Sequence, residues 1–180
     1  DRLPEIIQKN LSEGYWIFLK KKEDKKCHSN IEGCKFNTSS NKKVYMIGDS
    51  HAGSLIFNLK DKVVKNNYQF ITSTFAGCIF YPGFNLVDDK TMKLSEKCNN
   101  DYFQKLKEIL SKDKNSIFIF GGRFPLSISN YFFDNQEGGI EGKERGAKYV
   151  SVGRYETIQA SFQNEISELS KNNKIILIYP

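Results

Sequence analysis

The chain has 180 residues and a formal net charge of +6, and 39% of its residues are hydrophobic. This length fits one domain of ordinary size, and the apolar content excludes a disordered chain. The positive charge comes mostly from lysines beside acidic or amide residues, as in KKKEDKK, which is typical of solvated surfaces. Because arginine is scarce, we expect no nucleic-acid partner, and no run is long enough to span a membrane.

The chain divides into a lead-in segment, 1–41, and a main domain, 42–180. Within the lead-in, a helix with one apolar side is expected over 4–22. The stretch 27–43 is rich in Gly, Ser and Asn, and it is predicted to be a loop.

Strand and helix patterns alternate through the main domain. Short runs of β-branched and aromatic residues predict strands at 43–48, 68–75, 116–121 and 174–180. Apolar residues at helical spacing lie between them, over 53–66, 99–113 and 155–172. This alternation predicts an α/β fold with a central parallel sheet and right-handed crossovers.

Two long insertions interrupt the alternation, at 76–98 and 122–151. Each follows the carboxyl end of a predicted strand. In open α/β sheets this edge carries the active site, so we expect both insertions to border it.

Four cysteines are present, Cys27, Cys34, Cys78 and Cys98, and none has the CxxC spacing of a metal or redox site. Histidines are few, so no metal site is expected. An even number of cysteines in polar, turn-rich surroundings indicates two disulfides and an oxidising compartment. Three pairings are possible, and the short separations favour Cys27–Cys34 and Cys78–Cys98. The alternative is four free thiols in a cytosolic protein.

The first predicted core strand ends in Gly-Asp-Ser-His, and a helix pattern follows directly. Ser50 therefore lies where unpaired helix amides can stabilise negative charge on a serine or on an oxyanion. Gly48 lets the chain turn sharply. The alternative is that Asp49 or Ser50 only caps the helix, with loss of the Ser50 cap costing about 1 kcal/mol of stability.

This stretch resembles the first block of the SGNH (GDSL-like) hydrolases. More narrowly, GDSHAGSL is similar to the SGNH domain fused to bacterial membrane acyltransferase-3 proteins, and the resemblance covers 42–180. It implies a flavodoxin-like three-layer sandwich with a central parallel sheet, lacking its C-terminal segment here, and no cofactor. It also implies a periplasmic or extracellular location, tethered to the inner membrane through segments outside this chain.

Further sequence blocks of the family can each be matched separately to positions in this chain. The resemblance makes Ser50 the nucleophile and assigns the oxyanion hole to the amides of Ser50 and Gly77. The usual Gly-x-Asn-Asp block is replaced by GGRFP, which is similar to a small-small-Arg-aromatic segment of the acyltransferase-fused relatives. Arg123 is therefore expected to contact an oxyanion or a sugar. The alternatives are an ordinary turn glycine at Gly77 and an ion-paired surface arginine at Arg123.

The family's last block, Asp-x-x-His, has no counterpart in this chain, whose histidines are His28 and His51. His28 falls in the predicted disulfide loop. His51 adjoins Ser50, and adjacent side chains at a helix start diverge, which disfavours it as the base. We assign Asp49 and His51 no role beyond their place beside the nucleophile. The base is expected beyond Pro180, and this chain alone is expected to be nearly inactive.

The resemblance implies an O-acyltransferase for a bacterial cell-surface glycan, with acetyl as the expected acyl group and a membrane acyltransferase domain delivering the acyl donor. One alternative is a secreted carbohydrate esterase that removes acetyl groups by the same serine chemistry. Another is a non-catalytic glycan-binding domain whose aromatic residues, in FYPGFN and NYFF, stack on sugars. A flavodoxin-like FMN binder is disfavoured, because GDSHAGS is a poor Ser/Thr-rich phosphate loop.

Overall fold

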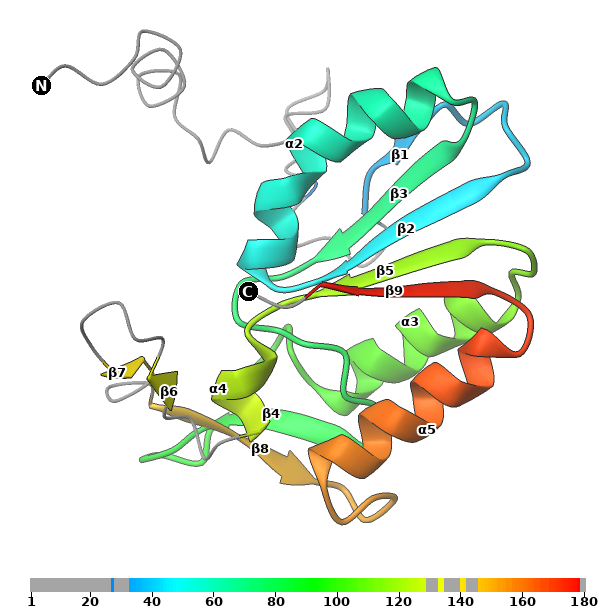
Figure 1. Cartoon of the computed structure of the whole chain (residues 1–180). Helices are drawn as coiled ribbons and strands as arrows, with labels where there is room; N and C mark the ends of the chain where they lie inside the picture. The colour runs from blue at the N-terminus through cyan, green and yellow to red at the C-terminus, as the bar shows by residue number, and fades with distance from the viewer. Residues whose placement is uncertain (1–26, 28–32, 129–132, 135–139, 142–145, 179–180) are drawn as a thin grey trace, which may run out of the picture.

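The computed structural model describes Cys27 and residues 33–128, 133–134, 140–141 and 146–178 (Figure 1). The central sheet contains β1 (Lys35–Phe36), β2 (Lys43–Gly48), β3 (Gln69–Thr74), β5 (Ile117–Gly121) and β9 (Lys174–Ile178). The described helices are α2 (Ser50–Lys65), α3 (Asn100–Ser111), α4 (Phe124–Ile128) and α5 (Ile158–Ser170). The remaining strands are β4 (Phe84–Asp88), β6 (Phe133–Asp134), β7 (Ile140–Glu141) and β8 (Ala147–Ser151). The helix predicted over 4–22 lies outside the described residues.

The central sheet has the strand order β1-β3-β2-β5-β9, so β2 lies in its middle. β2 pairs in parallel with β3 and β5, and β5 pairs in parallel with β9. The short β1 joins the edge of the sheet as an antiparallel neighbour of β3. The four predicted strands correspond to β2, β3, β5 and β9, which confirms the predicted α/β fold with a parallel core.

The two faces of the sheet are covered by different helices (Figure 1). On β2, Val44 and Met46 face α2, where they pack with Ala52. The alternate residues Tyr45 and Ile47 belong to the larger core cluster that contains apolar residues of α3 and α5. Because both faces are buried, the central strands read as continuous apolar runs instead of alternating ones.

Each of the three long helices begins after a polar residue that caps it. The capping side chains accept hydrogen bonds from first-turn amides, and they are Asp49 for α2, Asn99 for α3 and Thr157 for α5. Such caps satisfy amides that have no intrahelical partner. The cap at Asp49 explains why α2 starts at Ser50, three residues before the start of the predicted range.

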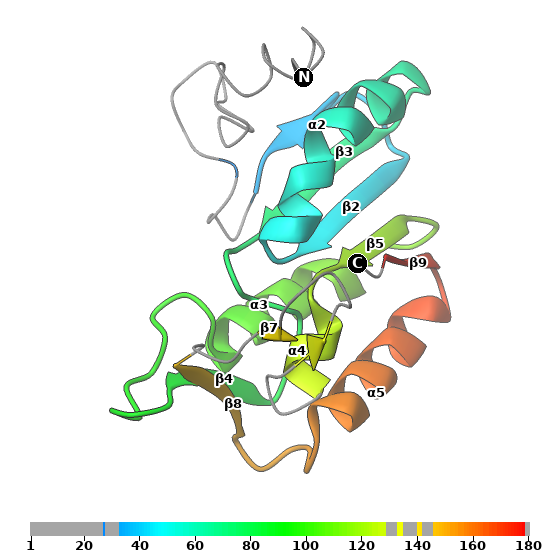
Figure 2. The same cartoon turned by 60° about the vertical axis from the view of Figure 1, so that its left-hand side comes forward.

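The two insertions pair with each other. β4, from the first insertion, and β8, from the second, form an antiparallel two-stranded sheet, with Leu86 opposite Tyr149. Figure 2 shows these strands side by side, apart from the central sheet. This small sheet brings Tyr149 close to the loop that follows β3.

Both disulfides that the sequence favoured are present, Cys27–Cys34 and Cys78–Cys98. The first bridge lies against β3, because the Cys34 amide donates to Thr72 Oγ1 at 3.1 Å and the Thr72 amide donates to the Cys34 carbonyl at 3.0 Å. All four cysteines are therefore oxidised, and the alternative of free thiols is wrong for this structure.

The buried phenol of Tyr102 predicts a loss of stability at high pH. Burial raises the pKa of Tyr102 from its ordinary value of 10.0 to about 12, and the hydrogen bond to Ser73 opposes this shift. Because the phenol holds its proton more tightly in the folded protein, its contribution to the free energy of unfolding is fully present below about pH 10. This contribution is lost as the pH rises through about 12. We expect the urea midpoint to fall over this window, and to fall less in Tyr102→Phe. If the urea midpoint fell equally with pH in the wild type and in Tyr102→Phe, the loss of stability could not be assigned to Tyr102.

Candidate active site

Three loops meet at the carboxyl edge of the sheet. The strand registers place Gly48 opposite Thr74 of β3 and opposite Gly121 of β5. Ser50, Gly77 and Arg123 follow these strands closely in the chain, so the three predicted site residues share one edge. This is the edge at which open α/β sheets bind ligands.

Gly48 is required by a close backbone approach. It has φ +146°, and a Cβ atom at this position would lie 1.7 Å from the carbonyl oxygen of Gly121. A Cβ on Gly121 would in turn lie 3.3 Å from the Cβ of Ala52. The small residues therefore allow the first turn of α2 to sit directly on the ends of β2 and β5.

Ser50 is the first residue of α2, and Asp49 is its cap. Asp49 Oδ1 accepts a hydrogen bond from the His51 amide at 2.8 Å, so the interpretation of Ser50 as the cap is wrong. Ser50 is half-buried, and no hydrogen bond of its hydroxyl is found among the described residues. Its amide is in the first turn, where helix amides have no intrahelical partner. Hydroxyl and amide therefore both lie at the positive end of the helix.

The Asp49 carboxylate ties two of the three loops together. It is only 2% exposed, and a buried carboxylate is costly unless it is hydrogen-bonded. Oδ1 accepts from the His51 amide, and Oδ2 accepts from the Arg123 amide at 2.9 Å. A Cβ on Gly122 would lie 3.2 Å from Asp49 Cγ, so the loop after β5 approaches the carboxylate closely.

His51 and Arg123 are in direct contact. Arg123 Nε donates a hydrogen bond to His51 Nε2 at 2.9 Å. The other ring nitrogen, Nδ1, is 3.5 Å from Asp49 Oδ1, and it has no hydrogen-bond partner among the described residues. Because a guanidinium only donates, Nε2 must carry the lone pair and Nδ1 the proton. Sequence reasoning did not find this contact, since only the sheet register brings the two loops together.

Gly77 lies in a tight turn that is anchored to β2. The Cys78 amide donates to the Phe75 carbonyl at 3.1 Å, and Gly77 has φ +68°, which favours glycine at the third position of such a turn. The Phe75 amide donates to the Gly48 carbonyl at 2.9 Å. The Gly77 turn therefore begins next to Gly48, the last residue of β2 before Asp49 and Ser50.

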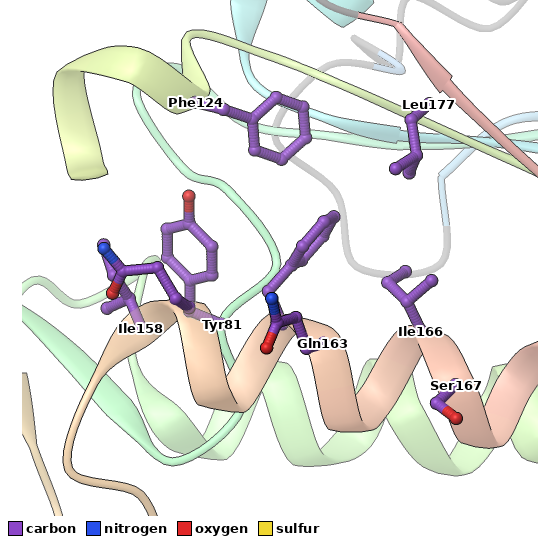
Figure 3. Close-up of a pocket in the computed structure, with 9 residues that line it drawn as sticks. Tyr81, Phe124, Ile158, Gln163, Ile166, Ser167 and Leu177 are labelled. Atoms are coloured by element: carbon purple, nitrogen blue, oxygen red, sulfur yellow. The ribbon is translucent and has the colours of Figure 1, made fainter.

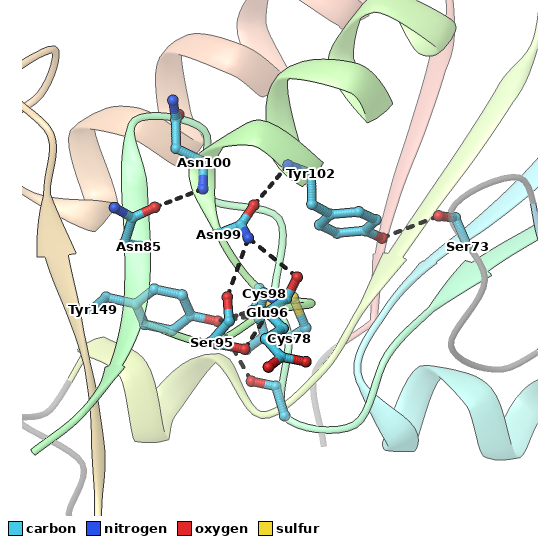
Figure 4. Close-up of a disulfide and its surroundings, with 12 residues drawn as sticks. Ser73, Cys78, Asn85, Ser95, Glu96, Cys98, Asn99, Asn100, Tyr102 and Tyr149 are labelled. Carbon is cyan, nitrogen blue, oxygen red and sulfur yellow. Dashed lines mark hydrogen bonds between the residues drawn. A yellow bond between two sulfur atoms is a disulfide. The ribbon is translucent and has the colours of Figure 1, made fainter. Parts of the chain in front are cut away.

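A disulfide and a tyrosine hold the Gly77 turn, and Figure 4 shows Tyr149 near the Cys78–Cys98 bridge. Cys78 is bonded to Cys98, just before α3. The Tyr149 hydroxyl accepts from the Ile79 amide at 3.1 Å, and it donates to the Gly77 carbonyl at 3.4 Å. The sequence did not indicate Tyr149, because five residues of β8 are too short a signal to predict its pairing with β4.

Removing the Cys78–Cys98 bridge is expected to destabilise the domain by about 3 kcal/mol, because the chain-entropy model relates stabilisation to loop length. The bridge spans a sequence separation of 20, whereas Cys27–Cys34 spans 7. The same model therefore gives about 2 kcal/mol for the shorter loop. Urea unfolding of the Cys78→Ala/Cys98→Ala and Cys27→Ala/Cys34→Ala proteins measures both losses. A smaller loss for the longer loop would contradict the expectation.

An apolar pocket of about 400 Å³ lies between α4, α5 and β9. Figure 3 shows Phe124 and Leu177 facing side chains of α5 across it, with Gln163 and Ile166 on the helix. Among the described residues that line this pocket there is no carboxylate, imidazole or thiol. The pocket therefore suits apolar groups.

The described residues show neither a metal-binding cluster nor a membrane-spanning helix. Within it, no three His, Cys, Asp or Glu side chains gather closely enough to hold a metal ion. No described helix combines the length and apolar character needed to cross a bilayer.

A mostly parallel sheet, with a serine at the turn from its middle strand into a helix, agrees with an SGNH-type α/β fold. The family model for the SGNH domain fused to AT3 domains matches residues 20–180, and the chain belongs to this family. No curated protein and no solved structure matches the chain. Membership indicates an acyltransferase- or esterase-like function, with a membrane acyltransferase domain as the partner of the SGNH domain.

Proposed function

We propose that this domain O-acylates a bacterial cell-surface glycan through an acyl-serine intermediate on Ser50, with acetyl as the transferred group. The observation that carries the proposal is the position of Ser50. It opens α2 at the carboxyl edge of the central strand, and Asp49 has taken over the capping role. A half-buried serine with no structural task at this place is suited to nucleophilic chemistry.

The reaction has two acyl transfers. Ser50 Oγ attacks the carbonyl carbon of the acyl donor while a base takes its proton, and the tetrahedral intermediate collapses with loss of the protonated leaving group. A sugar hydroxyl then attacks the acyl-serine and passes its proton to the same base. Collapse of this second intermediate forms the glycan ester and returns the proton to Ser50 Oγ.

The amides of Ser50 and Gly77 are proposed to hold the oxyanion of both intermediates. The Ser50 amide belongs to the first turn of α2, where the helix dipole favours negative charge. The Gly77 turn is fixed by its bond to Gly48 through Phe75 and by the Cys78–Cys98 bridge. Donors that are held in place before reaction stabilise developing charge without reorganising. Arg123 is proposed as a further donor to the oxyanion or to a sugar.

The base is proposed to come from outside this chain. The 180 residues contain two histidines and no Asp-x-x-His. His28 lies outside the described residues, and the acceptor nitrogen of His51 is engaged by Arg123. A serine without a base is a weak nucleophile, so the chain alone is proposed to be nearly inactive.

The proposed location is the periplasm or the cell exterior, with the whole protein tethered to the inner membrane. Two disulfides support an oxidising compartment. Fusion of the family to AT3 domains supports a membrane partner that delivers the acyl donor. The glycan acceptor is inferred from the family resemblance and from the extracytoplasmic location.

Fluorophosphonate labelling tests the proposal. In the full-length protein we expect the probe to modify Ser50, because an activated serine attacks it. The 180-residue chain should label hardly at all. Peptide mapping identifies the labelled residue. Strong labelling of the chain alone would contradict a base outside it, and absence of labelling in the full-length protein would favour a non-catalytic glycan-binding domain.

A secreted esterase would use the same serine, and family membership favours this second candidate as well. The two activities differ only in the acceptor. Purified full-length protein, acyl donor and glycan should yield acylated glycan by mass spectrometry if the domain is a transferase. Release of free acid from an acylated glycan, without transfer, would favour the esterase.

A further inference from the structure

We propose that His51 is a positioning residue that fixes the guanidinium of Arg123 at the sheet edge that carries Ser50, and that it does so as the neutral tautomer with its proton on Nδ1. The inference rests on the proposed function of Ser50. It assigns a task to the residue that follows the nucleophile, and this task differs from that of a general base.

The residues that flank Ser50 each hold Arg123. Its backbone amide donates to Asp49 Oδ2 at 2.9 Å, and its side-chain Nε donates to His51 Nε2 at 2.9 Å. One bond fixes the start of the side chain and the other fixes the guanidinium. A long, flexible side chain is thereby confined before any substrate arrives, which reduces the entropy lost on binding.

The tautomer follows from the hydrogen-bond chemistry. Arginine has no acceptor and stays protonated, so Nε2 of His51 must be unprotonated to accept from it. The ring proton then lies on Nδ1, which faces Asp49 Oδ1 at 3.5 Å. The buried carboxylate of Asp49 is close to Nδ1 without a hydrogen bond to it, and its negative charge favours a proton on this nitrogen. Asp49, His51 and Arg123 thus form one continuous chain of contacts.

This arrangement argues against His51 as the base. A general base must present a lone pair to the serine proton, and the lone pair of His51 is directed at Arg123. The ring is 43% exposed along its side chain, so it lies at the surface of the site and not in the core. A fixed guanidinium at this position suits an oxygen of the acyl group or of the sugar, because its planar N–H donors recognise oxygen acceptors.

The first experiment compares His51 variants in the full-length protein. Gln can place an amide oxygen near the position of Nε2, whereas Phe keeps the ring but has no acceptor. We expect His51→Gln to retain most acyl transfer, and His51→Phe to lose about 10- to 100-fold, as for one charge-assisted hydrogen bond. Thermal unfolding of both variants separates this effect from misfolding.

A double-mutant cycle with Arg123→Ala gives the decisive comparison. If His51 acts through Arg123, His51→Phe should cause little further loss in the Arg123→Ala background. Losses that multiply would overturn the inference, and so would a loss in His51→Phe as large as that in Ser50→Ala. If Ser50→Ala stays active, the proposed function fails, and the spectroscopic test below still decides the inference.

The tautomer can be measured without activity. The chain has two histidines, so ¹⁵N-histidine labelling gives two ring spectra, and His51→Phe identifies the signals of His51. At about pH 8, where imidazoles are generally neutral, we expect the Nδ1–H form for His51. Arg123→Ala should shift its tautomer ratio. An Nε2–H tautomer in the wild type, or a spectrum unchanged by Arg123→Ala, would overturn the inference.

Discussion

Replacing Ser50 with alanine in the full-length protein is expected to abolish acyl transfer and hydrolysis while leaving the domain folded. Loss of the nucleophile in serine triads lowers turnover by a factor on the order of a million. The fold should survive because Asp49, and not Ser50, caps α2. We therefore expect the change in unfolding free energy to stay within about 1 kcal/mol. Acyl-transfer assays and urea unfolding measure the two effects.

Ser54→Ala is the matched control. Ser54 lies in the same helix, and its hydroxyl donates to the His51 backbone carbonyl at 2.7 Å. This substitution removes a serine hydroxyl from α2 without touching the proposed nucleophile, so activity should be retained. A folded Ser50→Ala protein with full activity would end the catalytic interpretation. The glycan-binding domain would then be the better account.

The parallel core could be predicted because its signals are local. β2 matches the predicted range 43–48, and a continuous apolar run is what a strand with both faces buried requires. The pairing of β4 with β8 could not be predicted, because it joins two insertions that are far apart in the sequence. Neither insertion carries a periodicity long enough to distinguish a strand from a loop.

The candidate site also has parts that the sequence could predict and parts that it could not. Gly48 and Ser50 were indicated by one short stretch at the end of a strand, and their local geometry agrees with that pattern. The contact between His51 and Arg123 depends on the register of β2 with β5, which the sequence does not reveal. Gly122, directly before Arg123, was a usable signal, since it permits the close approach to Asp49.

Gly48→Ala is expected to cause the largest loss of stability among single substitutions at this edge. The added methyl would lie 1.7 Å from the Gly121 carbonyl oxygen and 3.0 Å from the Ala52 Cβ, and φ is +146°. The Gly121 carbonyl belongs to the backbone of β5, so it cannot move away without separating β2 from β5. Overpacking and backbone strain together should lower the unfolding free energy by more than about 3 kcal/mol. Urea unfolding gives this value directly.

Gly153→Ala separates steric clash from backbone strain. Gly153 also has a positive φ, +95°, but nothing lies within 4 Å of the position its Cβ would take. Only the conformational cost remains, which is about 1–2 kcal/mol for a left-handed non-glycine residue. Equal losses in the two variants would show that the approach of β2 to β5 is not what requires glycine at residue 48. A much larger loss in Gly48→Ala, accompanied by lost labelling of Ser50 in the full-length protein, would show that this approach also places the nucleophile.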